Sequence, residues 1–364
     1  MKRNLIFLLL ALSLCFAACD KDPQPNEPAD DGDPTLCYEV EGEQYILLTQ
    51  ESGQRWLFQV MPSNNAVLVN HYSHGYNYAA MNAQFSYRDE YKGDLVIPES
   101  FSHNGMTYTV AKIEDCAFEC CDHLNSITIP NTINYLGQFV FHTCFGLRNV
   151  ELPPTLDSIS HQCFFGCESL QTIQFPESLK YIGVLAFYNS GLKELQFKKN
   201  INIDEQAFAN CKELVTVSLP DGIDTINDAF SCCENLSSVF MPQSVKVIGA
   251  QAFSYTNLSS VDFPDALVRI EEYAFSHTPL TSIELPKTLQ CLNGFDHCPN
   301  LSEVTCLATA PPQIEYDDVF SESPLTVIYV PGESVDTYKS ANGWCDYADI
   351  IQPTPRMLSA SYKH

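Results

Sequence analysis

The sequence has 364 residues, enough for two or three ordinary domains or for one elongated domain. It contains 45 Asp and Glu residues against 19 Lys and Arg residues, which gives a formal net charge of −26. Because such a surface repels the phosphates of nucleic acid, the charge argues against a nucleic-acid partner and favours either simple solubility or a cationic partner.

The N-terminus has the pattern of a secretory signal. The basic start MKR precedes an apolar run over residues 5–14, which is too short to cross a bilayer. We therefore expect residues 1–18 to be a signal peptide for the Sec route. The tetrad FAAC that ends at Cys19 resembles a bacterial lipobox, although Phe16 stands where an aliphatic residue is usual. We expect Cys19 to carry a lipid, with ordinary signal cleavage nearby as the alternative.

The segment after Cys19 is predicted to be a tether. DKDPQPNEPADDGDPT contains six acidic residues and four prolines but almost nothing apolar, so it cannot bury a core. We place this extended, solvated tether at residues 19–36. Its first residues, DKD, resemble the acidic surface-export signal of Bacteroidetes lipoproteins. That resemblance implies an outer-membrane lipoprotein that is exposed at the cell surface and contacts the membrane through its N-terminal lipid.

Residues 37–92 show the alternation that is typical of β strands. Apolar and polar residues alternate in YEVEGEQYILL and WLFQV, so we expect a β-rich N-terminal cap or small module. A stretch within this region, HYSHGYNY, contains His71 and His74 at a spacing that two metal ligands can have. Its many tyrosines favour a β-hairpin or a surface loop instead.

A repeat of 22 or 23 residues dominates residues 93–310. Each unit reads roughly Ile-x-x-x-Ala-Phe-x-x-Cys-x-x-Leu-x-x-Ile-x-Ile-Pro, as in KIEDCAFECCDHLNSITIP. Nine copies are present, more than the three or so that a self-supporting stack needs. A period this regular predicts a solenoid. The phenylalanine column consists of Phe118, Phe141, Phe164, Phe187, Phe208, Phe230, Phe253, Phe275 and Phe295.

The repeat unit predicts a short strand followed by a turn. Alternate residues of Leu-x-x-Ile-x-Ile point inward, and stacking such strands about 4.8 Å apart makes a parallel sheet. Proline then ends the strand because it lacks a donor for the ladder. The Ala-Phe turn returns on the convex side, where phenylalanine fills the core. We therefore expect an α/β solenoid of about nine rungs with a short-stranded parallel sheet.

These residues resemble the leucine-rich repeats of the BspA and Treponema pallidum type, over about residues 93–312. Residues 91–113 resemble the opening hairpin of that family, and residues 327–351 resemble its closing segment. Both would cap the open ends of the sheet, so we assign residues 311–364 to a C-terminal cap. The resemblance implies a cell-surface protein, since some members are linked to adhesion to host matrix proteins and to other bacteria.

The sixteen cysteines suggest disulfides at first, but the repeat register argues against them. Ser190, Thr256 and Thr278 replace cysteine at one column position, which indicates a thiol packed as a small hydrophobe. Cys120 and Cys232 lie beside this column and are expected to be exposed, oxidisable thiols. The column consists of Cys121, Cys144, Cys167, Cys211, Cys233 and Cys298.

The sequence shows no catalytic motif, so we expect no enzyme activity. His161, Cys163 and Cys167 have the spacing of metal ligands, but the repeat columns already explain both cysteines. We therefore expect neither a metal site nor a cofactor. Ser158 and Thr225, each between an Asp and an Ile, resemble the O-glycosylation signal of Bacteroidetes and are candidate modification sites.

The outward face of the predicted sheet is the remaining candidate site. It is mostly short and polar and becomes acidic towards its C-terminal end, and Phe240 is its one aromatic residue in the repeats. An apolar ring on a rigid polar surface is a typical anchor for a protein partner. We expect a monomer that binds a host matrix protein or a bacterial surface protein through this face. The candidate residues are Phe240, Glu151, Glu194, Asp262, Glu284 and Glu303.

Two other functions remain open. A glycan-binding accessory lipoprotein would use aromatic platforms, and the richest aromatic cluster spans residues 72–91, outside the repeats. A structural spacer of the envelope would have no specific ligand. The fold alone does not choose among these functions.

Overall fold

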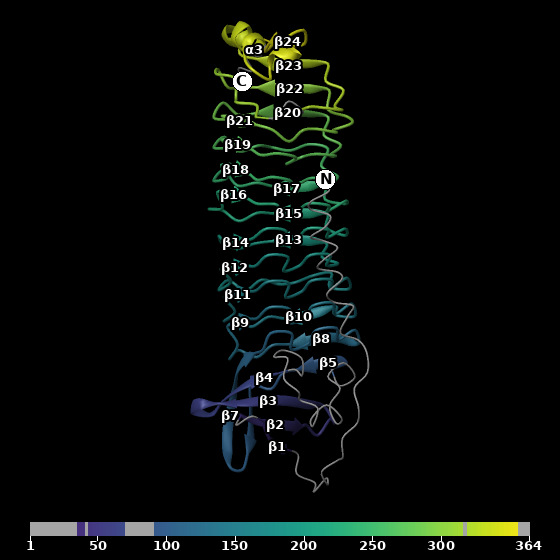
Figure 1. Ribbon diagram of the computed structural model, residues 1–364, viewed down its shortest axis with the longest axis vertical. Helices are drawn as coiled ribbons and strands as arrows, with labels where there is room; N and C mark the ends of the chain where they lie inside the picture. The colour runs from purple at the N-terminus through teal and green to yellow at the C-terminus, as the bar shows by residue number, and fades with distance from the viewer. Residues whose placement is uncertain (1–34, 41–42, 70–90, 316–318, 356–364) are drawn as a thin grey trace, which may run out of the picture.

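The computed structural model describes residues 35–40, 43–69, 91–315 and 319–355 of the chain. These residues form one long stack with a β sheet at one end and the short helix α3 (Val335–Ser340) at the other (Figure 1). Within the described part of the chain, no helix is long and apolar enough to cross a membrane.

The N-terminal end is a six-stranded sheet in the order β1-β2-β3-β4-β7-β6. Its pairs are antiparallel except β4 with β7, which run parallel. Asn104 and Gly105 form the tight turn between β6 and β7, with φ of 50° and 76°, as the twist of a two-residue hairpin requires. The strands are β1 (Thr35–Val40), β2 (Glu43–Thr49), β3 (Arg55–Met61), β4 (Asn65–Leu68), β6 (Ser100–His103) and β7 (Met106–Ile113).

Aromatic rings join this sheet to the repeats. Tyr91 is fully buried, and its ring centroid lies 5.3 Å from that of Trp56 and 4.8 Å from that of Phe118. The sheet and the stack therefore share one continuous hydrophobic core.

The repeats form a first ladder of parallel strands, which is divided into three sheets: β5-β8-β10, β13-β15-β17 and β20-β22-β23-β24. Residues 171–175 and 259–263 occupy the corresponding places in the stack but are not strands. The ladder is therefore interrupted at two rungs. Its strands are β5 (Gly93–Val96), β8 (Leu124–Thr128), β10 (Asn149–Glu151), β13 (Glu194–Gln196), β15 (Thr216–Ser218), β17 (Ser238–Phe240), β20 (Ser282–Leu285), β22 (Glu303–Cys306), β23 (Val327–Val330) and β24 (Ile351–Pro353).

A second ladder of two-residue strands runs along another side of the stack (Figure 1). The sequence pattern predicted one sheet only, because a strand of two residues has no alternation to detect. This ladder divides into two sheets, between β14 and β16. Its strands are β9 (Tyr135–Leu136), β11 (Ser158–Ile159), β12 (Tyr181–Ile182), β14 (Asn202–Ile203), β16 (Thr225–Ile226), β18 (Val247–Ile248), β19 (Arg269–Ile270) and β21 (Cys291–Leu292).

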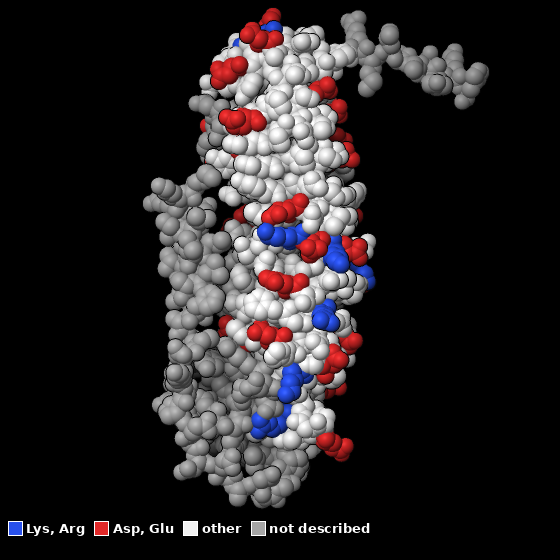
Figure 2. Space-filling model, turned by 90° about the vertical axis from the view of Figure 1, so that its right-hand side faces the viewer, with Lys and Arg blue, Asp and Glu red and all other residues white. Residues whose placement is uncertain are grey.

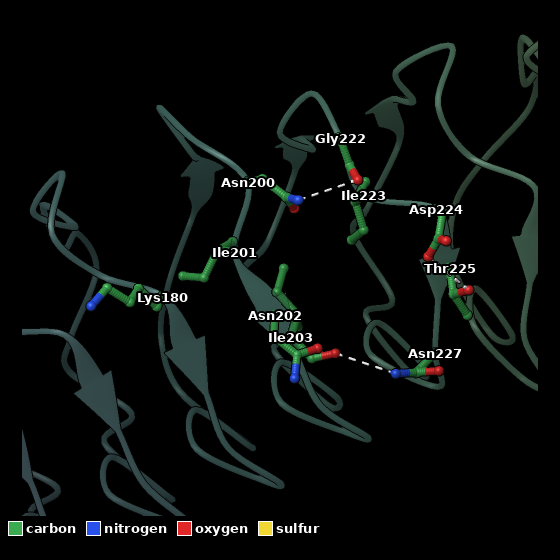
Figure 3. Close-up of a pocket in the computed structure, with 10 residues that line it drawn as sticks. All are labelled: Lys180, Asn200, Ile201, Asn202, Ile203, Gly222, Ile223, Asp224, Thr225 and Asn227. Carbon is green, nitrogen blue, oxygen red and sulfur yellow. Dashed lines mark hydrogen bonds between the residues drawn. The ribbon is translucent and has the colours of Figure 1, made fainter.

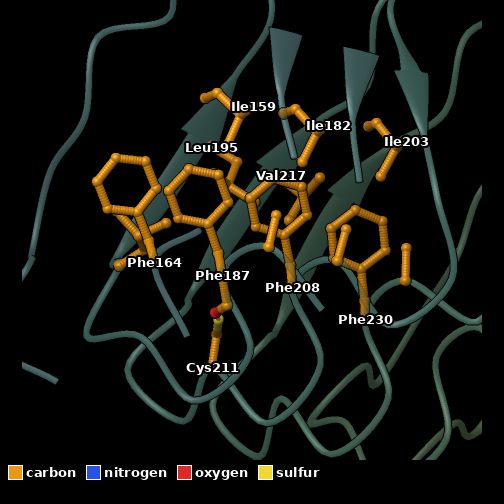
Figure 4. Close-up of a cluster of buried hydrophobic side chains, with 14 of the residues drawn as sticks. Ile159, Phe164, Ile182, Phe187, Leu195, Ile203, Phe208, Cys211, Val217 and Phe230 are labelled. Carbon is orange, nitrogen blue, oxygen red and sulfur yellow. Dashed lines mark hydrogen bonds between the residues drawn. The ribbon is translucent and has the colours of Figure 1, made fainter. Parts of the chain in front are cut away.

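The phenylalanine column forms the centre of the core, as the repeat predicted. The rings from Phe118 to Phe295 stack with centroid distances of 5.0 to 5.8 Å, and Figure 4 shows four of them in a row. Phe320 stacks on Phe295 at 6.1 Å and adds a turn beyond the nine predicted rungs. The solenoid is thus confirmed.

The convex side consists of turns, so the helical content of the described chain is low. Besides α3, the helical segments of the described chain are three 3-10 segments: η1 (Pro62–Asn64), η3 (Gly332–Ser334) and η4 (Cys345–Tyr347).

The column cysteines do more than fill space. The thiol of Cys144 donates to the carbonyl oxygen of Phe118 in the preceding rung at 3.0 Å, and Cys211 does the same to Phe187 at 3.1 Å. Burial raises the pKa of Cys144 well above its usual value, so the thiol keeps its proton. The cysteines whose side chains are described are free thiols. The packing interpretation was therefore incomplete, because the column selects a small hydrogen-bond donor.

Cys120 and Cys232 belong to a second column, in which every residue has a positive φ. We call it the left-handed column. Both cysteines are only half-buried, so they are less exposed than the sequence suggested. Their amides bond to carbonyl oxygens of the next rung, at 2.8 Å in each case, which offsets the unfavourable backbone conformation. The column consists of Cys120, Thr143, Gly166, Asn189, Asn210, Cys232, Tyr255, His277, His297 and Glu322.

Candidate functional site

The outward side chains of the first ladder form two parallel columns, and we call this surface the strand face. One strand residue on each side of the buried central position points outward, as in β13, β15 and β20. The pairing registers align Ser218 with Phe240 in one column and Thr216 with Ser238 in the other. The same registers align Glu284 with Thr305 and Ser282 with Glu303.

All six predicted partner-binding residues are exposed on the strand face. The structure brings four of them together. Phe240, Asp262 and Glu284 occupy three successive rungs of one column, and Glu303 lies in the neighbouring column on the rung after Glu284. We call these four residues the acidic–aromatic patch.

The other two predicted residues lie on earlier rungs, outside the run of consecutive rungs from Phe240 to Glu303. Glu151 is four rungs from Phe240, roughly 19 Å at the usual strand spacing, and accepts a hydrogen bond from Thr128 at 3.0 Å. Glu194 is two rungs from Phe240 and lies in the other column.

Phe240 is the most exposed large apolar residue of the described chain, at 63%. It lies on the last strand of the middle sheet, because β17 pairs with β15 but not with residues 259–263. Val239 beneath it is only partly buried, whereas Val217 at the same position of β15 is 2% exposed. The core is therefore less tightly closed under this ring than one rung earlier.

The strand face carries no basic side chain around the acidic–aromatic patch, because its outward columns from Thr216 to Thr305 contain none. On the side of the stack drawn in Figure 2, basic side chains lie in the lower and middle parts and at the C-terminal cap, with acidic and uncharged side chains between them. Arg148 and Lys193 directly precede the first outward residue of their rungs. Both of these basic residues come before β15 in the stack. The cap strand β23 adds Tyr329, which pairs with Thr305 and is half-buried. The repeat pattern missed this second aromatic residue because it lies after the last repeat.

A cavity of about 320 Å³ lies where the second ladder is interrupted (Figure 3). The corner from Lys198 to Ile203 is one residue shorter than the corners on either side, which begin at Pro176 and Pro220. At intact corners, the residue after the ladder isoleucine donates its amide to the preceding rung, as Gly249 does to Ile226 at 2.7 Å. Here the side chain of Asn227 makes that bond instead, at 3.4 Å.

Polar side chains line much of this cavity. The amide of Asn200 donates to the carbonyl oxygen of Gly222 at 3.3 Å, and Gly222 has a φ of +95°. Thr225 forms part of the wall, and its hydroxyl donates to Asp224 at 3.3 Å. The cavity lining includes neither histidine nor cysteine. Its amides and hydroxyls suit hydrogen bonding.

The structure separates the two candidate glycosylation sites. Ser158 lies in β11, within an intact part of the second ladder, whereas Thr225 lies in β16, at the interruption. Both side chains are half-buried.

Asp228 follows the cavity and is an unusual carboxylate. Burial raises its pKa to about 6, although hydrogen bonds from Gln206 and Ser231 lower it. The Gln206 amide donates to Oδ2 at 2.9 Å, while Oδ1 is buried and has no hydrogen-bond partner within the described chain. This residue costs stability, since a buried carboxylate prefers its neutral form.

Several predicted features lie outside the described residues. These are Cys19, nearly all of the tether, His71, His74 and the tyrosines of residues 72–90. Tyr91, at the end of that aromatic cluster, is described and fully buried, so it offers no platform for a glycan.

Comparisons with known proteins agree with the architecture. The model of the BspA type leucine rich repeat region matches residues 99–215, 192–302 and 224–347. A search of curated proteins found no match.

Three solved structures resemble this one. A leucine-rich repeat protein from Bacteroides ovatus is 21% identical over 82% of each chain, with a TM-score of 0.52. One from Eubacterium ventriosum is 16% identical over 82% of this chain and 78% of the other, with a TM-score of 0.50. The Treponema pallidum leucine rich repeat protein is 25% identical over 55% of this chain and 86% of the other, with a TM-score of 0.45. The two-ladder stack, the stacked phenylalanine column and the match over most of its length show that this chain belongs to the BspA-type leucine-rich repeat family.

Proposed function

We propose that this protein is a non-enzymatic module that binds a protein partner at the cell surface, through the acidic–aromatic patch. The observation that carries the proposal is the exposure of Phe240, at 63%, on a strand of a regular ladder. A ring held in this way binds without first losing backbone freedom, and such aromatic anchors contribute much of the affinity at protein interfaces.

The charge around Phe240 defines the kind of partner. Asp262, Glu284 and Glu303 lie one, two and three rungs beyond the ring, and the outward columns from Thr216 to Thr305 contain no basic residue. A partner segment with an apolar side chain among lysines or arginines complements this surface. We infer a protein of the host matrix or of another bacterium, bound by a monomer without a cofactor.

The proposal includes attachment to the outer membrane. A lipid on Cys19 and the acidic tether of residues 19–36 would hold the folded stack away from the bilayer and leave the strand face accessible. The support for this part is the lipobox-like tetrad and the signal-like N-terminus.

The test is a pull-down of host extracellular proteins and bacterial surface proteins with the mature chain, followed by affinity measurements on each partner obtained. We expect Phe240→Ala and Glu284→Lys each to weaken binding at least 10-fold. Asp221→Lys is the matched control, because it makes the same kind of charge change at an exposed position in the corner after β15, outside the strand face. A partner that binds both patch variants and the control equally well would place the binding site elsewhere.

A further inference from the structure

Three aromatic side chains stack on the convex side near the C-terminal cap. Tyr255, His277 and His297 are successive members of the left-handed column, and all three are exposed. The ring centroids of Tyr255 and His277 are 4.2 Å apart, and those of the two histidines are 4.6 Å apart with an angle of 6° between the planes. The column thus places two imidazoles side by side on neighbouring rungs.

A buried carboxylate lies directly beneath these imidazoles. Asp296 is 4% exposed, and its Oδ2 accepts hydrogen bonds from Nδ1 of His297 at 2.9 Å and from the Ser276 hydroxyl at 2.8 Å. The same hydroxyl lies 2.8 Å from Nδ1 of His277. Because its single proton goes to the carboxylate, the hydroxyl accepts a hydrogen bond from His277.

The second oxygen of Asp296 is unsatisfied. Oδ1 is buried and accepts no hydrogen bond within the described residues. Leaving a buried carboxylate oxygen without a partner is costly, and a cation would remove that cost. This oxygen distinguishes the cluster from an ordinary group of surface histidines.

We propose that His277, Asp296 and His297 bind one divalent transition-metal ion of the kind that prefers imidazole, such as Zn²⁺, Ni²⁺ or Cu²⁺. One ligand atom from each residue lies within 4.8 Å of the other two. A tetrahedral site with bonds near 2.0–2.1 Å needs ligand atoms roughly 3.3 Å apart. The exposed rings must therefore turn out of their parallel stack, and the ligand atoms must approach one another by up to about 1.5 Å.

One further feature suits a metal ion. Both histidines are exposed, so a water molecule can reach the ion and complete the coordination.

The expected consequence is a cross-link between two rungs. His277 belongs to one turn of the solenoid, while Asp296 and His297 belong to the next. An ion that binds only the folded stack raises its stability in proportion to the logarithm of the ion concentration. The C-terminal rungs would gain most, since each rung contacts only its neighbours.

The experiment is a titration of the full mature chain with Zn²⁺ after treatment with a chelator, followed by calorimetry and by thermal unfolding. We expect His277→Ala and His297→Ala each to lose one bound ion per chain, or to bind it at least 10-fold more weakly, and to lose the Zn²⁺-dependent rise in Tm. His123→Ala, which removes an exposed histidine of the first rung, is the matched control and should behave like the parent chain.

Both test histidines are exposed, so these variants are expected to fold. Asp296→Asn adds a second test if its far-UV spectrum matches that of the parent. The proposal is overturned if the double variant of His277 and His297 binds as much Zn²⁺ as the parent chain, or if His123→Ala loses as much.

Discussion

The thiol of Cys144 lies 3.0 Å from the carbonyl oxygen of Phe118, one rung away, and donates a hydrogen bond to it. The same bond recurs along the column, as between Cys167 and Phe141 at 3.2 Å. Where threonine replaces cysteine, a donor remains but its partner changes: the hydroxyl of Thr278 donates to the carbonyl oxygen of Phe275 in its own rung, at 2.7 Å. The exchange of Cys with Ser and Thr therefore preserves a donor as well as a volume.

This bond predicts the order of two substitutions at Cys144. Cys144→Ala removes the donor and leaves a small cavity, so we expect it to lower the free energy of unfolding by about 1–2 kcal/mol. Cys144→Ser keeps a donor and should cost less. Chemical denaturation measures both, with Cys345→Ala, at an exposed thiol, as the neutral control. If serine costs more than alanine, the position requires only a small apolar group.

The phenylalanine column predicts a large local effect. Phe187 is fully buried and stacks at 5.0 Å on Phe164 and at 5.2 Å on Phe208. We expect Phe187→Ala to cost about 3–5 kcal/mol. Because rungs are coupled only to their neighbours, the two ends of the stack should then unfold in separate steps. Hydrogen exchange checks this, and a single cooperative transition that is merely shifted would contradict it.

Asp228 predicts a pH dependence of stability. Its pKa is raised to about 6 in the folded chain, from an ordinary value near 3.8. Between these two values the folded state holds the proton more firmly than the unfolded state, so the free energy of unfolding falls as the pH rises. Above about pH 6 the Asp228 carboxylate is ionised in the folded chain, and the full loss of stability that its burial causes is present.

Asp228→Asn should remove this penalty. We expect the variant to be about 1–3 kcal/mol more stable than the parent at pH 7.5, with a much smaller difference at pH 4. Urea denaturation at both pH values measures the effect, and Asp221→Asn, at an exposed position, is the control. An equal difference at both pH values would show that the carboxylate does not titrate in this way.

The short corner predicts the effect of an insertion. Adding one residue between Lys199 and Asn200 restores the length that the neighbouring corners have. We expect β14 then to pair with β16 and the cavity to close, which should increase protection of the amide of Asn227 from hydrogen exchange. Unchanged protection would show that another feature causes the interruption.

The acidic–aromatic patch predicts different effects on binding and on stability. Because Phe240 is 63% exposed, Phe240→Ala should change the free energy of unfolding by less than about 0.5 kcal/mol, while it weakens partner binding at least 10-fold. Binding should also weaken as salt is raised from 50 to 500 mM, since salt screens the carboxylates. Loss of stability in parallel with loss of binding would mean that the ring supports the fold instead.

Much of the architecture was predictable because the repeat is local. Each rung buries the same few positions, so the phenylalanine column appears in the sequence at intervals of 20 to 23 residues. Alternation along each strand likewise predicted that Phe240 and the five acidic residues point outward, and all six are exposed. Whether they bind a partner stays a prediction.

The sequence by itself determined the repeat, the core columns and the outward face, because these depend on spacing within one rung. Only the tertiary structure decided how neighbouring rungs meet. It revealed the second ladder, the interruption beside the short corner, and the group formed by Asp296 with two histidines from adjacent turns. Such features depend on the alignment of residues about 20 apart, where a one-residue difference in length shifts the pairing of a whole rung.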